Sequence, residues 1–234
     1  MNPAAVLPTV ADIVLANPDA ARVFEKHEID FCCHGRRSLA DACVHAGADA
    51  SVVQAELDAL DAPAAAVAVP DGVGELIDHI VVTHHEYLRR ELPRLHELMG
   101  KVVNAHAERH PEVHDVALAL EAIEEDLLPH LLKEEHALFP MAKELVAADG
   151  PVTFGVGSVL HPIRVMHTEH DEVGELLATL HHRTNCFTPP DDACPTWQAL
   201  YAGLAELEHD VHTHVHLENN VLFPKILELE AAHN

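Results

Sequence analysis

Residues 130–140 read HLLKEEHALFP and residues 214–224 read HVHLENNVLFP, so the pattern His-x3-Glu-x3-Leu-Phe-Pro occurs twice in the chain. Residues four positions apart in an α-helix lie on the same face, about one turn apart. His130 with Glu134, and His214 with Glu218, therefore direct an imidazole and a carboxylate toward a common point. Two such helices facing each other predict a metal site with two nitrogen ligands and two carboxylates that can bridge.

The repeat extends further back, because a histidine followed by an acid precedes each motif. His85 lies 45 residues before His130 (130 minus 85), and His170 lies 44 residues before His214 (214 minus 170). This agreement indicates a repeated two-helix hairpin, and such internal repeats constrain the fold. We therefore add His85 and His170 to the predicted ligand set.

Two neighbouring histidines compete with these choices. His84 precedes His85, and only one of the two is expected to face the core, because adjacent positions in an α-helix are about 100° apart. We choose His85 because its spacing recurs in the second half. His167 lies three residues before His170 and is either a fifth imidazole ligand or a residue at the entrance of the site.

Four long segments with helical apolar periodicity follow one another over residues 73–108, 112–147, 158–184 and 195–229. Proline and glycine separate them, and none shows the alternation that is typical of strands. The sequence predicts an all-α protein with an up-down-up-down four-helix bundle.

The N-terminal residues predict a separate set of short helices, with Ser38 and Ser51 as N-caps. The segment 61–71, DAPAAAVAVPD, has the composition of a linker. We predict a small helical domain over residues 1–62 and a bundle domain over residues 72–230.

The composition excludes several classes of partner. Lys and Arg number 14 against 39 Asp and Glu, so the formal charge of -25 would repel a nucleic-acid backbone. No apolar run approaches the roughly 20 residues of a membrane span, and the N-terminus lacks the basic region of a secretory signal. We expect a cytoplasmic protein without a membrane partner, whose five cysteines are reduced.

Four imidazoles and two carboxylates exceed what one tetrahedral zinc ion accepts, and closed structural zinc sites usually include thiolates. Imidazole with bridging carboxylate suits a pair of iron ions, although zinc or manganese remains an alternative. Glu135 and Asp171 adjoin the predicted ligands and are candidate acceptors that fix imidazole orientation.

Cys32 and Cys33 are the second candidate site. Consecutive Cα atoms lie about 3.8 Å apart, below the usual range for a disulfide, so a bond between these cysteines would be strained. Two free thiols suit thiol exchange or transient iron capture, and basic neighbours can lower a thiol pKa. These neighbours are Lys26, His34, Arg36 and Arg37. A buried, inert pair is the alternative.

The histidine-rich ligand set resembles that of the hemerythrin-like family, whose bundles bind an oxo- and carboxylate-bridged di-iron centre. With the segment Phe31-Cys32-Cys33-His34-Gly35 included, the whole chain resembles the iron-sulfur cluster repair di-iron proteins, also called the repair of iron centres family. The resemblance implies ligation of two Fe ions by six residues: His85, His130, Glu134, His170, His214 and Glu218.

The same resemblance implies a function and partners. Members restore clusters damaged by nitrosative or oxidative stress, react with nitric oxide and form dimers. Damaged or cluster-free iron-sulfur proteins would be the partners, with nitric oxide or dioxygen as the small ligand. Iron donation is our favoured interpretation. Nitric oxide reduction and a hemerythrin-like dioxygen-binding sensor or carrier are the alternatives.

Overall fold

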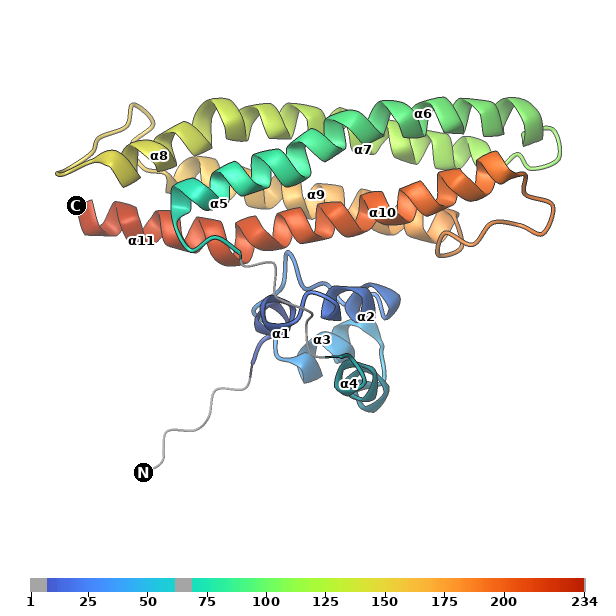
Figure 1. Ribbon diagram of the computed structural model, residues 1–234, viewed down its shortest axis with the longest axis horizontal. Helices are drawn as coiled ribbons and strands as arrows, with labels where there is room; N and C mark the ends of the chain where they lie inside the picture. The colour runs from blue at the N-terminus through green and yellow to red at the C-terminus, as the bar shows by residue number, and fades with distance from the viewer. Residues whose placement is uncertain (1–7, 62–68, 234) are drawn as a thin grey trace.

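The computed structural model describes residues 8–61 and 69–233, and all regular elements within these ranges are helices. The predicted all-α class is therefore confirmed. A long bundle lies above a small group of helices formed by residues 10–58 (Figure 1).

The N-terminal group contains four short helices: α1 (Val10–Ala16), α2 (Ala20–Lys26), α3 (Leu39–Ala46) and α4 (Ala50–Asp58). Ser38 caps α3 as predicted, because its hydroxyl accepts the Asp41 N–H at 3.2 Å. The prediction for Ser51 is wrong. Asp49 is the N-cap of α4 instead. Its carboxylate accepts the Ser51 N–H at 2.8 Å, so Ser51 lies inside the first turn.

The bundle consists of four rods, three of which contain a π-helical turn. The first rod joins α5 (Val73–Ile80), η1 (Val81–His85) and α6 (Glu86–His106); the second joins α7 (Val113–Lys133), η2 (Glu134–Leu138) and α8 (Phe139–Ala147). The third is α9 (Leu160–Arg183), and the fourth joins α10 (Pro195–Leu217), η3 (Glu218–Leu222) and α11 (Phe223–His233). Successive rods run in opposite directions (Figure 1), which confirms the up-down-up-down bundle.

The Leu-Phe-Pro tail of each motif marks the end of a π-helical turn. The Phe139 N–H donates to Glu134 O, five residues back, and the Phe223 N–H donates to Glu218 O in the same way. Proline has no N–H, and its ring crowds the carbonyl four residues before it. Pro140 therefore opposes continuation of regular α-helix, and a wider turn just before it relieves that conflict.

A π-helical turn rotates less per residue than an α-helical turn, so two consecutive side chains can face the core. His84 and His85 are 4% and 0% exposed, and Leu138 and Phe139 are 1% and 2% exposed. The expectation that only one of His84 and His85 faces the core is wrong, because it assumed α-helical rotation across residues 81–85, which form η1.

The apolar core falls into two clusters along the bundle. On α9, Met166 belongs to one cluster and Val173 to the other, with His170 between them. The smaller cluster, here called the distal cluster, is formed mainly by α5, α8, α11 and the first turns of α9. The larger cluster, here called the main cluster, fills the rest of the bundle. A band of buried polar residues therefore separates the two apolar regions.

The main cluster also includes the N-terminal helices, so the two parts of the chain share apolar packing. Phe31 packs edge-on against His212 and His216 of α10, with ring centroids 6.0 and 5.6 Å apart. The division into domains at residues 1–62 and 72–230 stays a prediction, and residues 62–68 of the predicted linker lie outside the described residues.

A buried ion-pair cluster connects α2 to α10. Glu25 accepts hydrogen bonds from His209 at 2.9 Å and from His212 at 3.3 Å, and the Glu25 side chain is 9% exposed. Burial disfavours the charged carboxylate, but the two histidines outweigh that effect and lower the Glu25 pKa from 4.5 to about 2. Burial likewise opposes protonation of His212, but Glu25, with Glu208 and Asp30, raises its pKa above 6.5.

We expect Glu25→Gln to reduce the free energy of unfolding by about 1–3 kcal/mol near pH 6 and by much less near pH 9. Because the folded state lowers the Glu25 pKa, ionised Glu25 stabilises the fold fully at pH values above 4.5. This contribution is lost as the pH falls toward 2. Because the folded state raises the His212 pKa, protonated His212 stabilises the fold fully at pH values below 6.5. This contribution is lost as the pH rises through the pKa of His212 in the folded state. Urea unfolding of both proteins at the two pH values measures the difference.

Glu121→Gln, an exposed position on α7, is the control. An equal loss of stability for Glu25→Gln at both pH values would contradict the coupling to His212.

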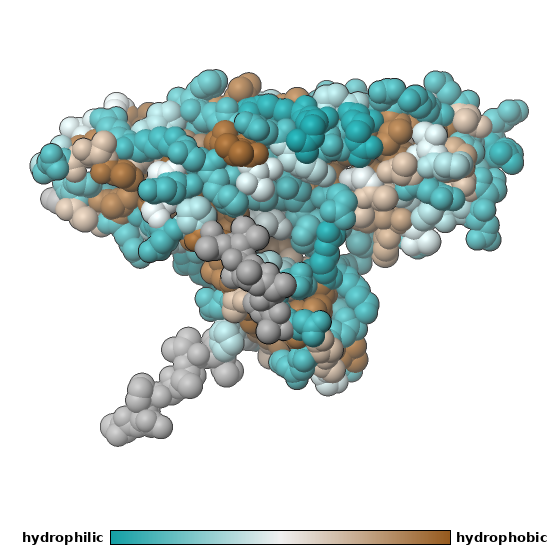
Figure 2. Space-filling view, in the orientation of Figure 1, coloured by the Kyte–Doolittle hydropathy of each residue, from teal (hydrophilic) through white to brown (hydrophobic). Residues whose placement is uncertain are grey.

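The face of the molecule seen in Figure 2 is mostly hydrophilic, with scattered apolar patches. No helix among the described residues is both long enough and apolar enough to cross a membrane.

Candidate metal centre

The structure brings all six predicted ligand residues into one band between the two apolar clusters. Each is at most 3% exposed, and each of the four rods contributes at least one. They are His85 at the end of η1, His130 in α7, Glu134 at the start of η2, His170 in α9, His214 in α10 and Glu218 at the start of η3.

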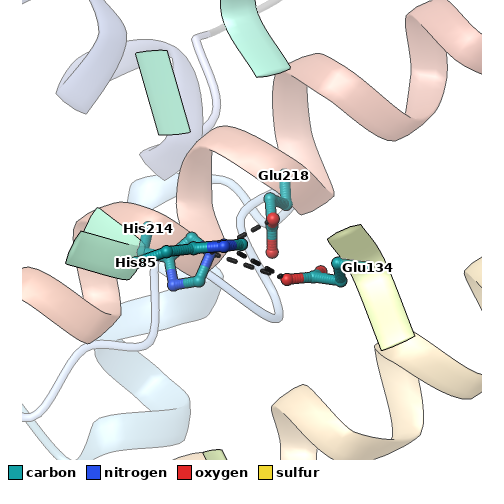
Figure 3. A group of neighbouring side chains, drawn as sticks. All are labelled: His85, Glu134, His214 and Glu218. Carbon is teal, nitrogen blue, oxygen red and sulfur yellow. Dashed lines mark hydrogen bonds and ion pairs between the residues drawn. The ribbon is translucent and has the colours of Figure 1, made fainter. Parts of the chain in front are cut away.

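The first ligand group consists of His85, His214, Glu134 and Glu218, whose donor atoms all lie within 4.8 Å of one another (Figure 3). The Nε2 atoms of His85 and His214 are 3.2 Å apart. His85 Nε2 lies 3.4 Å from Glu134 Oε2, and His214 Nε2 lies 3.1 Å from Glu218 Oε1.

The second ligand group consists of His130, His170 and the same two glutamates. The Nε2 atoms of His130 and His170 are 3.1 Å apart. His130 Nε2 lies 3.3 Å from Glu134 Oε1, and His170 Nε2 lies 3.2 Å from Glu218 Oε2. Each glutamate therefore turns one oxygen to each group, which is the orientation of a carboxylate that bridges two ions.

The donor spacing fits two metal ions. Two donors at right angles on one ion, each about 2.1 Å away, lie about 3.0 Å apart. The four carboxylate oxygens of Glu134 and Glu218 are buried and accept no hydrogen bond from any described protein group. Buried carboxylates without such partners are costly, and coordination of a cation removes that cost.

Hydrogen bonds to the far side of three imidazoles support the same conclusion. The Nδ1 atom of His85 lies 2.7 Å from a Glu135 carboxylate oxygen, and that of His130 lies 2.9 Å from Glu169. An ionised carboxylate only accepts, so Nδ1 carries the proton and the neutral ring presents a lone pair at Nε2. Where both rings of a pair are neutral in this form, their Nε2 atoms face each other as two acceptors, and a cation between them would satisfy both.

His170 is oriented by a neutral group, since its Nδ1 lies 2.9 Å from Asn219 Oδ1. Glu135 was among the candidate orienting residues, whereas Glu169 and Asn219 were missed. Asn219, and not Asp171, accepts the Nδ1 proton of His170, while Asp171 lines a separate cavity. The repeat held the missing signal: Asn219 follows Glu218 as Glu135 follows Glu134.

The two competing histidines lie outside both ligand groups. His84 stacks on His214 with ring centroids 5.5 Å apart, and its Nδ1 lies 2.9 Å from Asp210. His167 is exposed and packs edge-on against Phe223 at 5.5 Å. His84 therefore supports a ligand ring, and His167 lies at the periphery.

Without metal, the buried carboxylates hold protons on nearby rings. Burial opposes protonation of His130, but Glu134 and Glu218 outweigh burial and raise its pKa to about 9. Burial also works against ionisation of Glu218, yet His214 and His170 lower its pKa well below 4.5. Metal binding must displace these protons, as is general for histidine sites.

Cys32 and Cys33 lie on the loop that faces the bundle, and both are free thiols. The expectation of a lowered thiol pKa is wrong for Cys32. The hydrogen bond to Cys33, burial and the neighbouring Asp30 carboxylate all raise the Cys32 pKa well above its usual value. Lys26 pairs with Glu56 at 2.8 Å instead.

Two family models match the chain. Residues 7–61 match a domain of unknown function (DUF542), and residues 76–226 match the hemerythrin HHE cation binding domain. The bundle and its histidine–carboxylate centre thus define a hemerythrin-like protein.

The relatives specify the family further. Proteins named iron-sulfur cluster repair protein YtfE, from Enterobacter sp. (strain 638) and Escherichia coli (strain K12 / DH10B), are each 40% identical over 220 residues. The alignments cover 93% of this chain and 96% of each relative. The chain belongs to this family of iron-sulfur cluster repair proteins.

Proposed function

We propose that this protein repairs damaged iron-sulfur clusters by supplying iron from two Fe ions held by His85, His130, Glu134, His170, His214 and Glu218. The observation that carries the proposal is the pair of shared glutamates, whose oxygens each approach a different pair of imidazoles. The repair role follows the printed names of the relatives.

The ligand set favours donation of iron over permanent retention. Four of the six ligands are neutral imidazoles, so two carboxylates compensate the charge of two divalent ions. A centre with less charge compensation than a carboxylate cage retains its ions less firmly. Iron bound there would supply ions for transfer and, in its reduced state, two electrons.

A cavity of about 140 Å³ on the bundle surface reaches the second ligand group, with His130 and His170 in its wall. Glu125, Asp126 and Glu172 also line it, together with the ion pair between Lys133 and Glu169. The acidic wall attracts a cation, so this cavity supports passage of iron to and from the centre.

We test donation with the iron-loaded protein and a cluster-free ferredoxin or aconitase, mixed without air. The expected result is loss of iron from this protein together with recovery of the acceptor cluster. Formation of nitrous oxide from nitric oxide with all iron retained would instead identify a nitric oxide reductase. A stable oxygenated species that is indifferent to loss of Cys32 and Cys33 would identify a dioxygen carrier.

The acceptors under this proposal are damaged or cluster-free iron-sulfur proteins, and the protein acts as a cytoplasmic homodimer. Five free cysteines suit a reducing compartment. Light scattering on the iron-loaded protein measures the oligomeric state. The mass of a monomer would contradict the proposed homodimer.

A further inference from the structure

A cavity of about 480 Å³ lies between the N-terminal helices and the α9–α10 face of the bundle. Its wall includes Asp30, Cys32 and Cys33 from the loop, with Asp171 and Glu175 from α9 opposite. Glutamates, aspartates and histidines supply most of its polar groups, and no lysine or arginine lines it. The cavity therefore favours a cation.

The donor atoms at the loop end of this cavity have the spacing of a tetrahedral metal site. Cys32 Sγ lies 3.8 Å from Cys33 Sγ. Two thiolates bound about 2.3 Å from one ion at a tetrahedral angle lie about 3.8 Å apart. Asp30 Oδ1 lies 3.4 Å from Cys32 Sγ, close to the separation of about 3.5 Å for a carboxylate and a thiolate on the same ion.

We propose that Cys32, Cys33 and Asp30 form a third metal site, which binds one thiolate-preferring divalent cation such as Fe²⁺ or Zn²⁺ and leaves its fourth position open to the cavity. The three donors lie within 4.8 Å of one another. This inference rests on the proposed function, because it places a hand-over position for iron beside the di-iron centre.

The loop is held next to the centre by two asparagines of η3. The Cys32 carbonyl accepts hydrogen bonds from Asn220 Nδ2 at 2.9 Å and from Asn219 Nδ2 at 3.4 Å. The same Asn219 accepts the Nδ1 proton of His170 at 2.9 Å. One amide side chain thus connects the cysteine loop to a predicted iron ligand.

Asp30 also has a structural role that the test must separate from ligation. Its Oδ1 accepts the Cys33 N–H at 2.8 Å and the Cys32 N–H at 3.1 Å, and its Oδ2 lies 2.6 Å from His34 Nδ1. An asparagine keeps the carbonyl oxygen that accepts the backbone N–H groups but loses the negative charge. Asp30→Asn therefore preserves the turn and weakens ligation.

Binding is a ligand exchange without electron transfer. Each thiol releases its proton to solvent, and each sulfur donates a lone pair to the ion, which loses bound water. Release of the ion reverses these steps, so the site can receive and pass on a cation without any oxidant or reductant.

The test adds Co²⁺ to the full chain with its iron already bound and measures iron before and after. We expect one further equivalent of Co²⁺, with thiolate-to-cobalt charge-transfer absorption in the near ultraviolet. Cys32→Ser/Cys33→Ser should abolish this absorption, whereas Cys186→Ser, at an exposed cysteine elsewhere, should retain it. We expect Asp30→Asn to bind Co²⁺ at least about tenfold more weakly.

A second measurement needs no variant. Bound Zn²⁺ should protect Cys33, the more exposed thiol of the pair, from alkylation and leave Cys186 reactive. Absence of the charge-transfer absorption, its survival in the double variant, or equal alkylation with and without Zn²⁺ would each overturn the third site.

These outcomes are independent of the proposed function. A protein that restores a cluster-free acceptor but shows no thiolate absorption would disprove the third site alone. A protein that shows the absorption but never delivers iron would disprove the donor function and leave the third site standing.

Discussion

Glu134→Gln is expected to lower the affinity for iron by about a hundredfold or more and to remove both ions, not one. Its two oxygens face different ligand groups, 3.4 Å from His85 Nε2 and 3.3 Å from His130 Nε2. An amide keeps the shape of the side chain but loses the charge and one oxygen donor. Iron quantification and Mössbauer spectroscopy on protein purified without air measure the loss.

Glu135→Gln is the matched control, because it changes the adjacent residue in the same way. Glu135 touches the far side of the His85 ring and accepts its Nδ1 proton at 2.7 Å. Loss of such an orienting partner costs about tenfold in affinity, so this variant should still bind two irons at high metal concentration. Equal losses in both variants would show that Glu134 does not bridge.

Removal of iron is expected to lower the thermal midpoint by about 10 °C, since a ligand bound far above its dissociation constant contributes about 4 kcal/mol. The loss should concentrate in α5, α8 and α11. Their apolar cluster is the smaller of the two and is separated from the main cluster by the ligand band. Without metal, that band contains two buried carboxylates whose charge is balanced by protons on neighbouring imidazoles.

Hydrogen exchange with and without a chelator measures where the protection is lost. Residues 73–80, 139–147 and 223–233 should exchange faster, while the buried segment around Trp197 and Leu200 should change little. Uniform loss of protection along the bundle would contradict the idea that the ligand band joins two separate apolar regions.

The sequence was sufficient to identify six residues that the structure brings together, because the duplicated spacing selected them. His85 and His170 alone would have been ambiguous, and the matching distances to His130 and His214 selected them. The all-α class followed from helical periodicity and from proline and glycine at the boundaries. These signals are local in the chain, so they needed no knowledge of packing.

Features that depend on packing were not predicted. The π-helical turns were missed, although Pro140 and Pro224 stand directly after two of them. Glu169 was missed because it orients a ring on another helix, His130, and not the adjacent His170. The direction of the Cys32 pKa shift was misjudged because basic residues that are near in sequence need not contact the thiol. The charged group that contacts the Cys32 thiol is Asp30.

The shared glutamates make the two halves of the bundle interdependent. His85 belongs to the first hairpin and His214 to the second, yet both lie in the first ligand group, and His130 and His170 form the second ligand group in the same crossed manner. An approximate two-fold axis that exchanges the hairpins therefore also exchanges the two ligand groups. The residues around the imidazoles break that symmetry. Glu135 contacts His85 where Asn219 contacts His170, and Glu169 contacts His130 where His84 stacks on His214. The two ligand groups thus differ in their surroundings rather than in their residue types, and the group that contains His170 is the one that Asn219 connects to the cysteine loop.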